Sequence, residues 1–171
     1  KYTEYKAGRI QMPDELKQQF PIAKELLMHM GITYYEIENY EADDIIGTFA
    51  QFCEEDENYT GTIISSDKDL LQLISNTVEI KLLKSKDYII YNESNFKEEW
   101  GIDPINIIDL KALMGDASDN IPGVKGVGEK TAFDLINKFS TLTNIYEHID
   151  EVKGKLKEKL ILPFNVLFSG L

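Results

Sequence analysis

The chain has 171 residues, and its 18 Lys and Arg against 30 Asp and Glu give a formal net charge of −12 at pH 7. This balance argues against a protein held to nucleic acid by a generally basic surface, although a local basic group can still bind it. Hydrophobic residues make up 43%, which is enough for a packed core and too much for a disordered chain. The single cysteine, Cys53, excludes an internal disulfide and fits a reducing compartment.

The sequence carries no membrane or export signal. No apolar run approaches the ~20 residues that span a bilayer, and the opening KYTEYKAGR lacks the apolar core of a signal peptide. We therefore expect a soluble, cytoplasmic protein with one main domain and a small appended lobe. Because the chain begins with Lys1 rather than Met, we also expect a fragment or a processed product.

In chain order, the first predicted element is a helix over residues 14–30, where apolar residues recur at helical spacing. Pro21 predicts a break in it near Phe20, because a proline ring removes a donor and crowds the preceding turn. The β-branched and aromatic residues 33–37 predict a short strand, and residues 41–52 predict a second helix.

The next stretch alternates strands and helices. Residues 60–66 predict a buried strand, residues 69–74 are helix-like, and residues 78–83 and 88–92 predict two more strands. Alternation of this kind is typical of βαβ units, so we expect an α/β fold with a mainly parallel sheet and helices on both of its faces.

From Asp103 onward the pattern is helical only. Asp103 followed by Pro104 predicts an N-cap and a first helical residue, with the helix running to about Met114. A loop rich in Gly, Asp and Asn follows, and another helix is predicted to begin near Glu129. Its predicted apolar face comprises Ala132, Leu135, Ile136 and Phe139. This second half predicts a helical lobe packed on the α/β part.

Acidic residues gather in three places that could meet in the fold. They are Glu41, Asp43 and Asp44 at a helix start, Asp67 and Asp69 after a strand, and Asp116 and Asp119 in a loop. Helix capping and turn formation explain each group taken alone. However, ligands bind at the carboxyl ends of strands in open α/β sheets, which is where the second group stands. Seven converging carboxylates would repel one another unless cations lay between them, and oxygen ligands without histidine or cysteine suit Mg²⁺ or Mn²⁺.

A glycine-rich stretch, PGVKGVGEKT, covers residues 122–131, and we call it the glycine loop. Its glycines are Gly123, Gly126 and Gly128. It is not a Walker A loop, because Glu129 separates the last glycine from Lys130, and Thr131 excludes the dinucleotide fingerprint. Glycines before a helix start let a phosphate approach the backbone, with Lys125 and Lys130 as charge partners, although a plain helix-to-helix turn with glycine caps remains the alternative.

A short basic group, YKAGR, lies near the beginning of the chain. If this segment is helical, Lys6 and Arg9 share a face and could steer a scissile phosphate, with Tyr5 available to stack on a base. A solvated surface patch is the ordinary alternative.

Four blocks, EYKAGR, NYEADDIIG, SSDKDLLQLI and GDASDNIPGVKGVGEKTA, stand in this order and cover roughly residues 5–149. Together they resemble the bacterial 5′ nuclease family, which comprises the 5′-to-3′ exonuclease domain of DNA polymerase I and stand-alone relatives akin to flap endonucleases. The resemblance implies a PIN-like α/β nuclease domain over residues 1–102 with a remnant of a helical arch. It also implies a helix-three-turn-helix lobe over residues 103–171, in which the tail beyond about residue 161 has no assigned role.

The resemblance also implies roles for particular residues. Lys6 and Arg9 match arch residues that contact the scissile phosphate, and the glycine loop matches a loop that binds DNA phosphates together with K⁺. Two divalent cations are implied, one held by Glu41, Asp43 and Asp44 and the other served chiefly by Asp67, Asp69, Asp116 and Asp119. The implied activity is structure-specific hydrolysis of DNA in replication and repair. The implied partners are 5′ flaps and nicked or branched duplexes, bound by a monomer whose parent protein can carry a polymerase domain.

One departure concerns the start of the chain. Members of the family begin with two strands that each carry an aspartate of the first metal site, and neither strand precedes Lys1. This leaves open a second hypothesis, a catalytically incomplete fragment that binds branched DNA. A Mg²⁺-dependent phosphatase or phosphoacceptor domain is a third hypothesis, which leaves the glycine loop without a purpose.

Overall fold

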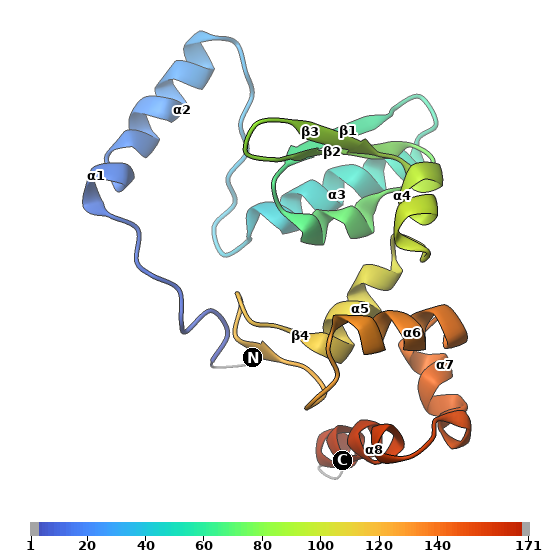
Figure 1. Ribbon diagram of the computed structural model, residues 1–171. Coiled ribbons are helices and arrows are strands. Elements are labelled where there is room, and N and C mark those ends of the chain that lie inside the picture. Colours follow the sequence, from blue (N-terminus) through green and yellow to red (C-terminus); the bar gives the residue numbers. More distant parts are fainter. Residues whose placement is uncertain (1–3, 169–171) are drawn as a thin grey trace.

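A computed structural model describes residues 4–168 of the chain. Its first helices, α1 (Asp14–Lys17) and α2 (Gln19–His29), stand away from the body of the molecule (Figure 1). The predicted break lies at Gln18 instead of near Phe20. Pro21 is the third residue of α2, in the first turn, where a missing N–H removes no helical hydrogen bond.

The predicted strand at residues 33–37 is wrong. This segment is irregular and exposed, and no described strand pairs with it. Strand propensity expresses fit to a pleated, half-buried surface, and this segment has no such surface beside it. Tyr35 instead packs against Phe49 of α3 (Ala42–Glu55), with the ring centroids 5.2 Å apart.

A three-stranded sheet forms the upper part of the body in Figure 1. Its order is β1 (Gly61–Ser65), β2 (Val78–Leu83), β3 (Tyr88–Tyr91). The β1 and β2 strands pair in parallel, whereas β2 and β3 pair antiparallel. The α/β class is therefore confirmed, but the expectation of a mainly parallel sheet holds for only one of the two pairings, because β2 and β3 are joined by a short turn that reverses the chain.

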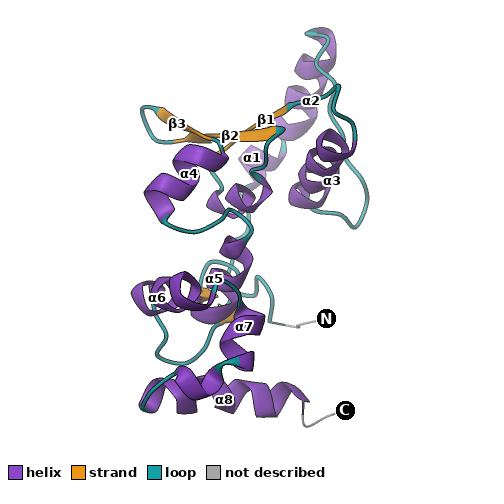
Figure 2. Ribbon diagram, turned by 90° about the vertical axis from the view of Figure 1, so that its right-hand side faces the viewer, coloured by secondary structure: helices purple, strands orange, loops and turns teal. Residues whose placement is uncertain are grey.

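Helices cover one face of this sheet in the described part of the chain. Figure 2 shows α3 and α4 (Glu93–Trp100) on the same side of the strands, and the 3-10 helix η1 (Lys68–Leu73) also packs on β2. The expectation of helices on both faces is therefore wrong for residues 4–168. The predicted buried strand, β1, is only half-buried, because side chains on its outer face such as Ile64 (62% exposed) point away from these helices.

The second half is helical, as predicted, around a small hairpin. It comprises α5 (Asn106–Met114), β4 (Gly115–Asp116), β5 (Ile121–Pro122), α6 (Glu129–Phe139), α7 (Leu142–Glu147), η2 (Ile149–Glu151) and α8 (Lys155–Phe168). The predicted cap on α5 is wrong: Asp103 accepts the Asn106 N–H through its backbone oxygen, while its carboxylate pairs with Lys97. All four residues predicted for the apolar face of α6 are buried. The tail beyond residue 161 continues the backbone of α8 to Phe168, and the last three residues lie outside the described range.

One hydrophobic core runs through both halves. Fully buried Phe96 of α4 stacks on Trp100 at 5.1 Å between ring centroids, and Trp100 in turn lies 6.1 Å from Phe133 of α6. The predicted domain boundary at residues 102–103 thus falls between α4 and α5, inside a continuously packed region. Within residues 4–168, none of the helices is long and apolar enough to cross a membrane.

Candidate active site

Side chains from five separate segments line one pocket at the carboxyl end of β1, with a volume of about 410 Å³. We call it the acid pocket, and its charged residues are Lys6, Arg9, Glu41, Asp43, Asp67, Lys68, Asp69, Lys111 and Asp119. The two remaining predicted acids line neighbouring pockets that share Asp43 and Asp69 with it: Asp44 on one side and Asp116 on the other. All seven predicted acids therefore lie in one neighbourhood.

The first acidic group opens α3. Glu41 is the N-cap residue, and its backbone N–H donates to the Asp44 carboxylate at 2.9 Å, which turns that carboxylate to the helix end. Asp43 points to the acid pocket instead. Burial raises the pKa of Asp43, and the negative charges of Asp67, Glu41 and Asp69 raise it further. The ordinary capping role thus accounts for Asp44, whereas Asp43 stands in an excess of negative charge.

The second group is fixed by the turn that follows β1. Asp67 caps η1 by accepting the Asp69 N–H at 2.9 Å, and its own N–H donates to the Ser65 hydroxyl at 3.0 Å. η1 packs against β2, α3 and α5, so it stands where the sheet and the helical half meet. Both carboxylates line the acid pocket, at the carboxyl end of β1.

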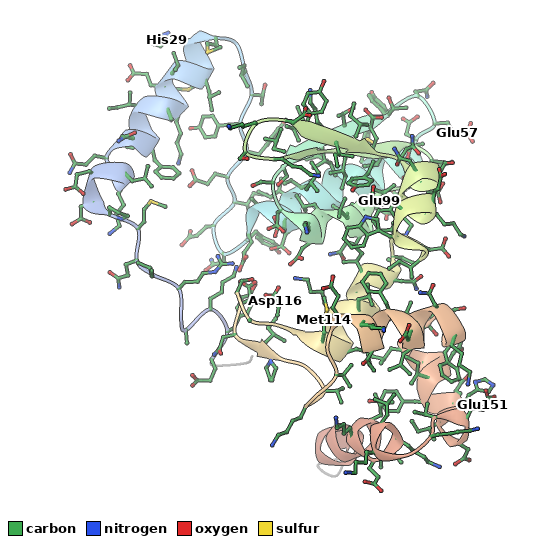
Figure 3. The ribbon with its side chains drawn as sticks, in the orientation of Figure 1. His29, Glu57, Glu99, Met114, Asp116 and Glu151 are labelled. Carbon is green, nitrogen blue, oxygen red and sulfur yellow. The ribbon has the colours of Figure 1, made fainter. Side chains whose placement is uncertain are left out.

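The third group lies on the hairpin, where Figure 3 labels Asp116 on the side facing the sheet. Its carboxylate accepts hydrogen bonds from Lys111 at 2.6 Å and from the Ser118 N–H at 2.9 Å. These bonds, with Lys111 first, hold the pKa of Asp116 far below its usual range. Lys111 also contacts Asp69 at 2.7 Å, so its ammonium bridges the two halves of the molecule.

Sequence reasoning missed Lys111. The available signal was its place as the basic residue of an otherwise mostly apolar helix, five positions before Asp116. Although partial burial opposes it, hydrogen bonding to Asp116 and Asp69 raises the pKa of Lys111. The side chain is only one-third exposed, which indicates a specific role for its charge.

The basic pair reaches the pocket by a turn. The segment is not helical: Lys6 has a positive φ of 60°, and the Arg9 N–H donates to the Lys6 carbonyl at 3.1 Å. Lys6 pairs with Glu41, and Arg9 pairs with Asp119. The side-chain hydrogen bond to Asp119 raises the pKa of Arg9. Desolvation lowers the pKa of Lys6, but the hydrogen bonds and charges of Glu41 and Tyr5 together raise it above its usual value. The Lys6 ammonium lies 4.7 Å from the centroid of the Tyr5 ring.

The acids do not form a finished coordination sphere. No three acid, histidine or cysteine side chains among residues 4–168 converge closely enough to hold a metal ion. The seven acids therefore share one neighbourhood, and Lys6, Arg9 and Lys111 pair with four of them. Histidine stands apart, as expected: Figure 3 shows His29 at the far tip of α2, and His148 stacks on Phe139.

The glycine loop packs on the helical half and presents an exposed rim. Val124 and Val127 anchor it in the core, while Lys125 and Lys130 are exposed and Thr131 is half-buried. Gly123 lies against the backbone of Gly115, where an added Cβ would meet a nitrogen at 2.2 Å. Gly128 is the N-cap residue of α6. Because glycine has no side chain, it cannot cap the first N–H groups of that helix. These features leave backbone N–H groups and two lysines at the exposed rim of the loop.

Two family models together match residues 1–165. They are the 5′-3′ exonuclease N-terminal resolvase-like domain, over residues 1–101, and the 5′-3′ exonuclease C-terminal SAM fold, over residues 102–165. The chain belongs to the 5′-3′ exonuclease family. DNA polymerase I of Bacillus caldotenax is 51% identical over 162 residues, which cover 93% of this chain and 18% of that protein. The chain thus spans about a fifth of the length of the curated relatives it matches.

Solved structures of this exonuclease family agree with the fold. The T5 5′-exonuclease with bound zinc ions matches 98% of this chain and 65% of its own, with a TM-score of 0.76 and 28% identity. The bacteriophage T5 flap endonuclease in a pseudo-enzyme-product complex with DNA and metal ions matches the same two shares, with a TM-score of 0.73 and 26% identity.

Proposed function

We propose that this exonuclease-family chain provides the catalytic groups of a metal-dependent, structure-specific 5′-to-3′ exonuclease or flap endonuclease that hydrolyses DNA. One observation carries the proposal: Asp43, Asp67 and Asp69 share a single pocket with Lys6 and Arg9. The family membership and the printed descriptions of the T5 relatives support it. The proposal includes a parent protein with a polymerase domain, as in the relatives from Bacillus, acting as a cytoplasmic monomer.

The chemistry of the pocket fits Mg²⁺ or Mn²⁺. Its donors are carboxylate oxygens, which hard divalent cations prefer. Burial, followed by the charges of Asp67 and Glu41, raises the pKa of Asp43, and a bound cation would favour the charged carboxylate. The residues that would hold two such ions are Glu41, Asp43, Asp44, Asp67, Asp69, Asp116 and Asp119. Divalent cations in carboxylate sites supply Lewis acidity and lower the pKa of bound water for phosphodiester hydrolysis.

The remaining groups bind and orient the substrate. Lys6 and Arg9 now pair with carboxylates, and a scissile phosphate would offer them an anion of the same kind. Tyr5 would stack on a terminal base. The glycine loop, with Lys125 and Lys130, would hold the duplex backbone through the open N-terminus of α6, and we include a K⁺ ion at this loop. Recognition of backbone shape would make the protein specific for structure rather than base sequence.

A cleavage assay on a labelled 5′-flap DNA tests the proposal. With Mg²⁺ or Mn²⁺ the protein should release short 5′ products, and a chelator should abolish them. Asp67→Asn should lower cleavage at least 100-fold and leave binding of the flap in chelator within twofold, because the carboxylate serves the chemistry more than the docking. Cleavage by this variant at a near wild-type rate would contradict the role given to Asp67.

A second function, binding of branched DNA without catalysis, has one observation in its favour. Within the described range no three acids converge on a metal position, so residues 4–168 hold no preformed coordination site. The same assay separates the two functions. Flap DNA that is shifted in a gel, with no metal-dependent product, would favour the binding fragment.

A further inference from the structure

Lys159 of α8 contacts the glycine loop from outside the four sequence blocks that carry the resemblance. Its ammonium donates a hydrogen bond to the Gly126 carbonyl at 3.2 Å, across 33 positions of sequence. Its side chain also runs along this glycine, because a Cβ built on Gly126 would meet Nζ at 2.6 Å and Cε at 3.3 Å. Gly126 has a φ of +76°, a backbone conformation that favours glycine. The contact with Lys159 also leaves no room for a side chain at this position.

No described residue neutralises the charge of Lys159. Among residues 4–168 no carboxylate forms an ion pair with it, whereas its neighbour on the helix, Lys157, pairs with Asp150 at 2.6 Å. An ammonium carries three donors, and the Gly126 carbonyl uses one. The half-buried Lys159 therefore holds a positive charge and spare donors beside the exposed rim of the glycine loop.

We propose that Lys159 is a DNA-backbone-binding residue, which fixes the Gly126 carbonyl with one donor and offers the others to a phosphate of a duplex held at the glycine loop. This inference rests on the proposed function, because it needs DNA at that loop. Lys159 adds a third cation to Lys125 and Lys130, from a different helix. The protein is acidic overall, so the few cations on its binding face determine the salt dependence of binding.

The test is binding of a fluorescent 5′-flap DNA to the full 171-residue chain in chelator, over a series of salt concentrations. Lys159→Met keeps the aliphatic stem and removes the charge. It should weaken binding about threefold to tenfold and lower the slope of log affinity against log salt by about 0.9, the value for one phosphate contact. The fold-loss of affinity between ~50 and ~200 mM salt would then be about 3.5 times smaller than for wild type.

Two variants serve as controls. Lys159→Arg keeps the charge and should restore the wild-type slope. Lys86→Met removes an equally full charge from the exposed turn between β2 and β3, far along the chain from the loop, and should leave the slope unchanged. Thermal unfolding of each variant shows whether the fold is kept.

The outcomes separate the inference from the function on which it rests. A wild-type chain that does not bind the flap overturns the proposed function and the inference with it. Wild-type binding with an unchanged slope in Lys159→Met overturns the inference alone. Weaker binding at an unchanged slope, not restored by Lys159→Arg, would show that Lys159 only shapes the loop, which also overturns it.

Discussion

At the scale of single residues, the site consists of basic side chains paired with acidic ones. Lys6, Arg9 and Lys111 each pair with one or two of the predicted carboxylates, and they bring together segments up to 110 positions apart. Asp43 forms no ion pair with any described residue, and burial, together with the charges of Asp67 and Glu41, raises its pKa. The Asp43 carboxylate is therefore repelled by its acidic neighbours, whereas the carboxylates that pair with a basic side chain are neutralised. Disrupting a neutralised pair should lower stability, whereas removing the repelled charge should raise it.

Lys111→Met should lower the free energy of unfolding by about 1–2 kcal/mol at pH 7, because it leaves the mostly buried Asp116 without its cation. The native pKa of Asp116 is depressed, so its contribution is present above the unfolded pKa of about 4 and is lost as pH falls through the native value. Urea unfolding should show the difference from wild type at pH 7 and a smaller one below about pH 4. An equal difference at every pH would contradict this account, and Lys138→Met, at an exposed pair with Glu151, serves as the control.

Asp43→Asn should have the opposite sign in the metal-free protein. Because the native pKa of Asp43 is raised, its charged form costs stability above the usual aspartate pKa, and this cost disappears as the group is protonated at lower pH. The variant should be more stable at pH 7, by less than about 1 kcal/mol because the residue is exposed to solvent, and should match wild type below about pH 4. Thermal melts in chelator at both pH values measure this. A less stable variant at pH 7 would show that Asp43 is not under repulsion.

Periodicity predicted the packed elements well and the unpacked ones poorly. The four apolar positions of α6 are buried, and β2 and β3 stand within one residue of where alternation put them, because these elements bury one side against the core. Residues 33–37 have equal strand propensity and no partner, and they form no strand. The helix α5 begins two residues after the predicted start, because a backbone turn at Asp103 precedes it. The secondary-structure propensity of a segment does not predict which other elements it will pack against.

Replacing a glycine by alanine should have opposite effects on stability in the β4–β5 hairpin and in α3. Gly115→Ala should cost more than about 2 kcal/mol, because Gly115 has a φ of +77° and an added Cβ would stand 2.3 Å from the Gly123 nitrogen. Gly47→Ala, inside α3, meets nothing closer than 4.0 Å and should stabilise the protein by about 0.5–1 kcal/mol. Chemical unfolding of the two variants gives both values. Equal effects would show that the hairpin has room to relax.

At the scale of the whole molecule, the topology of the fold brings together residues that are far apart in the sequence. The order of motifs and the position of Asp67 and Asp69 after a strand were enough to predict that distant acids share one edge of the sheet, and they do. The one-sided covering of the sheet, Lys111 as a bridge and Lys159 on the glycine loop depend on how the two halves dock. That docking is set by the shared core around Phe96 and Trp100, and no local pattern encodes it.

In the proposed function, acids from three segments form one site that holds two divalent cations. The most direct measurement is a crystal structure of this chain grown with Mn²⁺, with the metal located by its anomalous signal. The account predicts Mn²⁺ in the acid pocket, bound by carboxylates from at least two of the groups that contain Asp43, Asp67 and Asp116. Mn²⁺ bound elsewhere, with Lys6, Arg9 and Lys111 still paired as they are here, would contradict it.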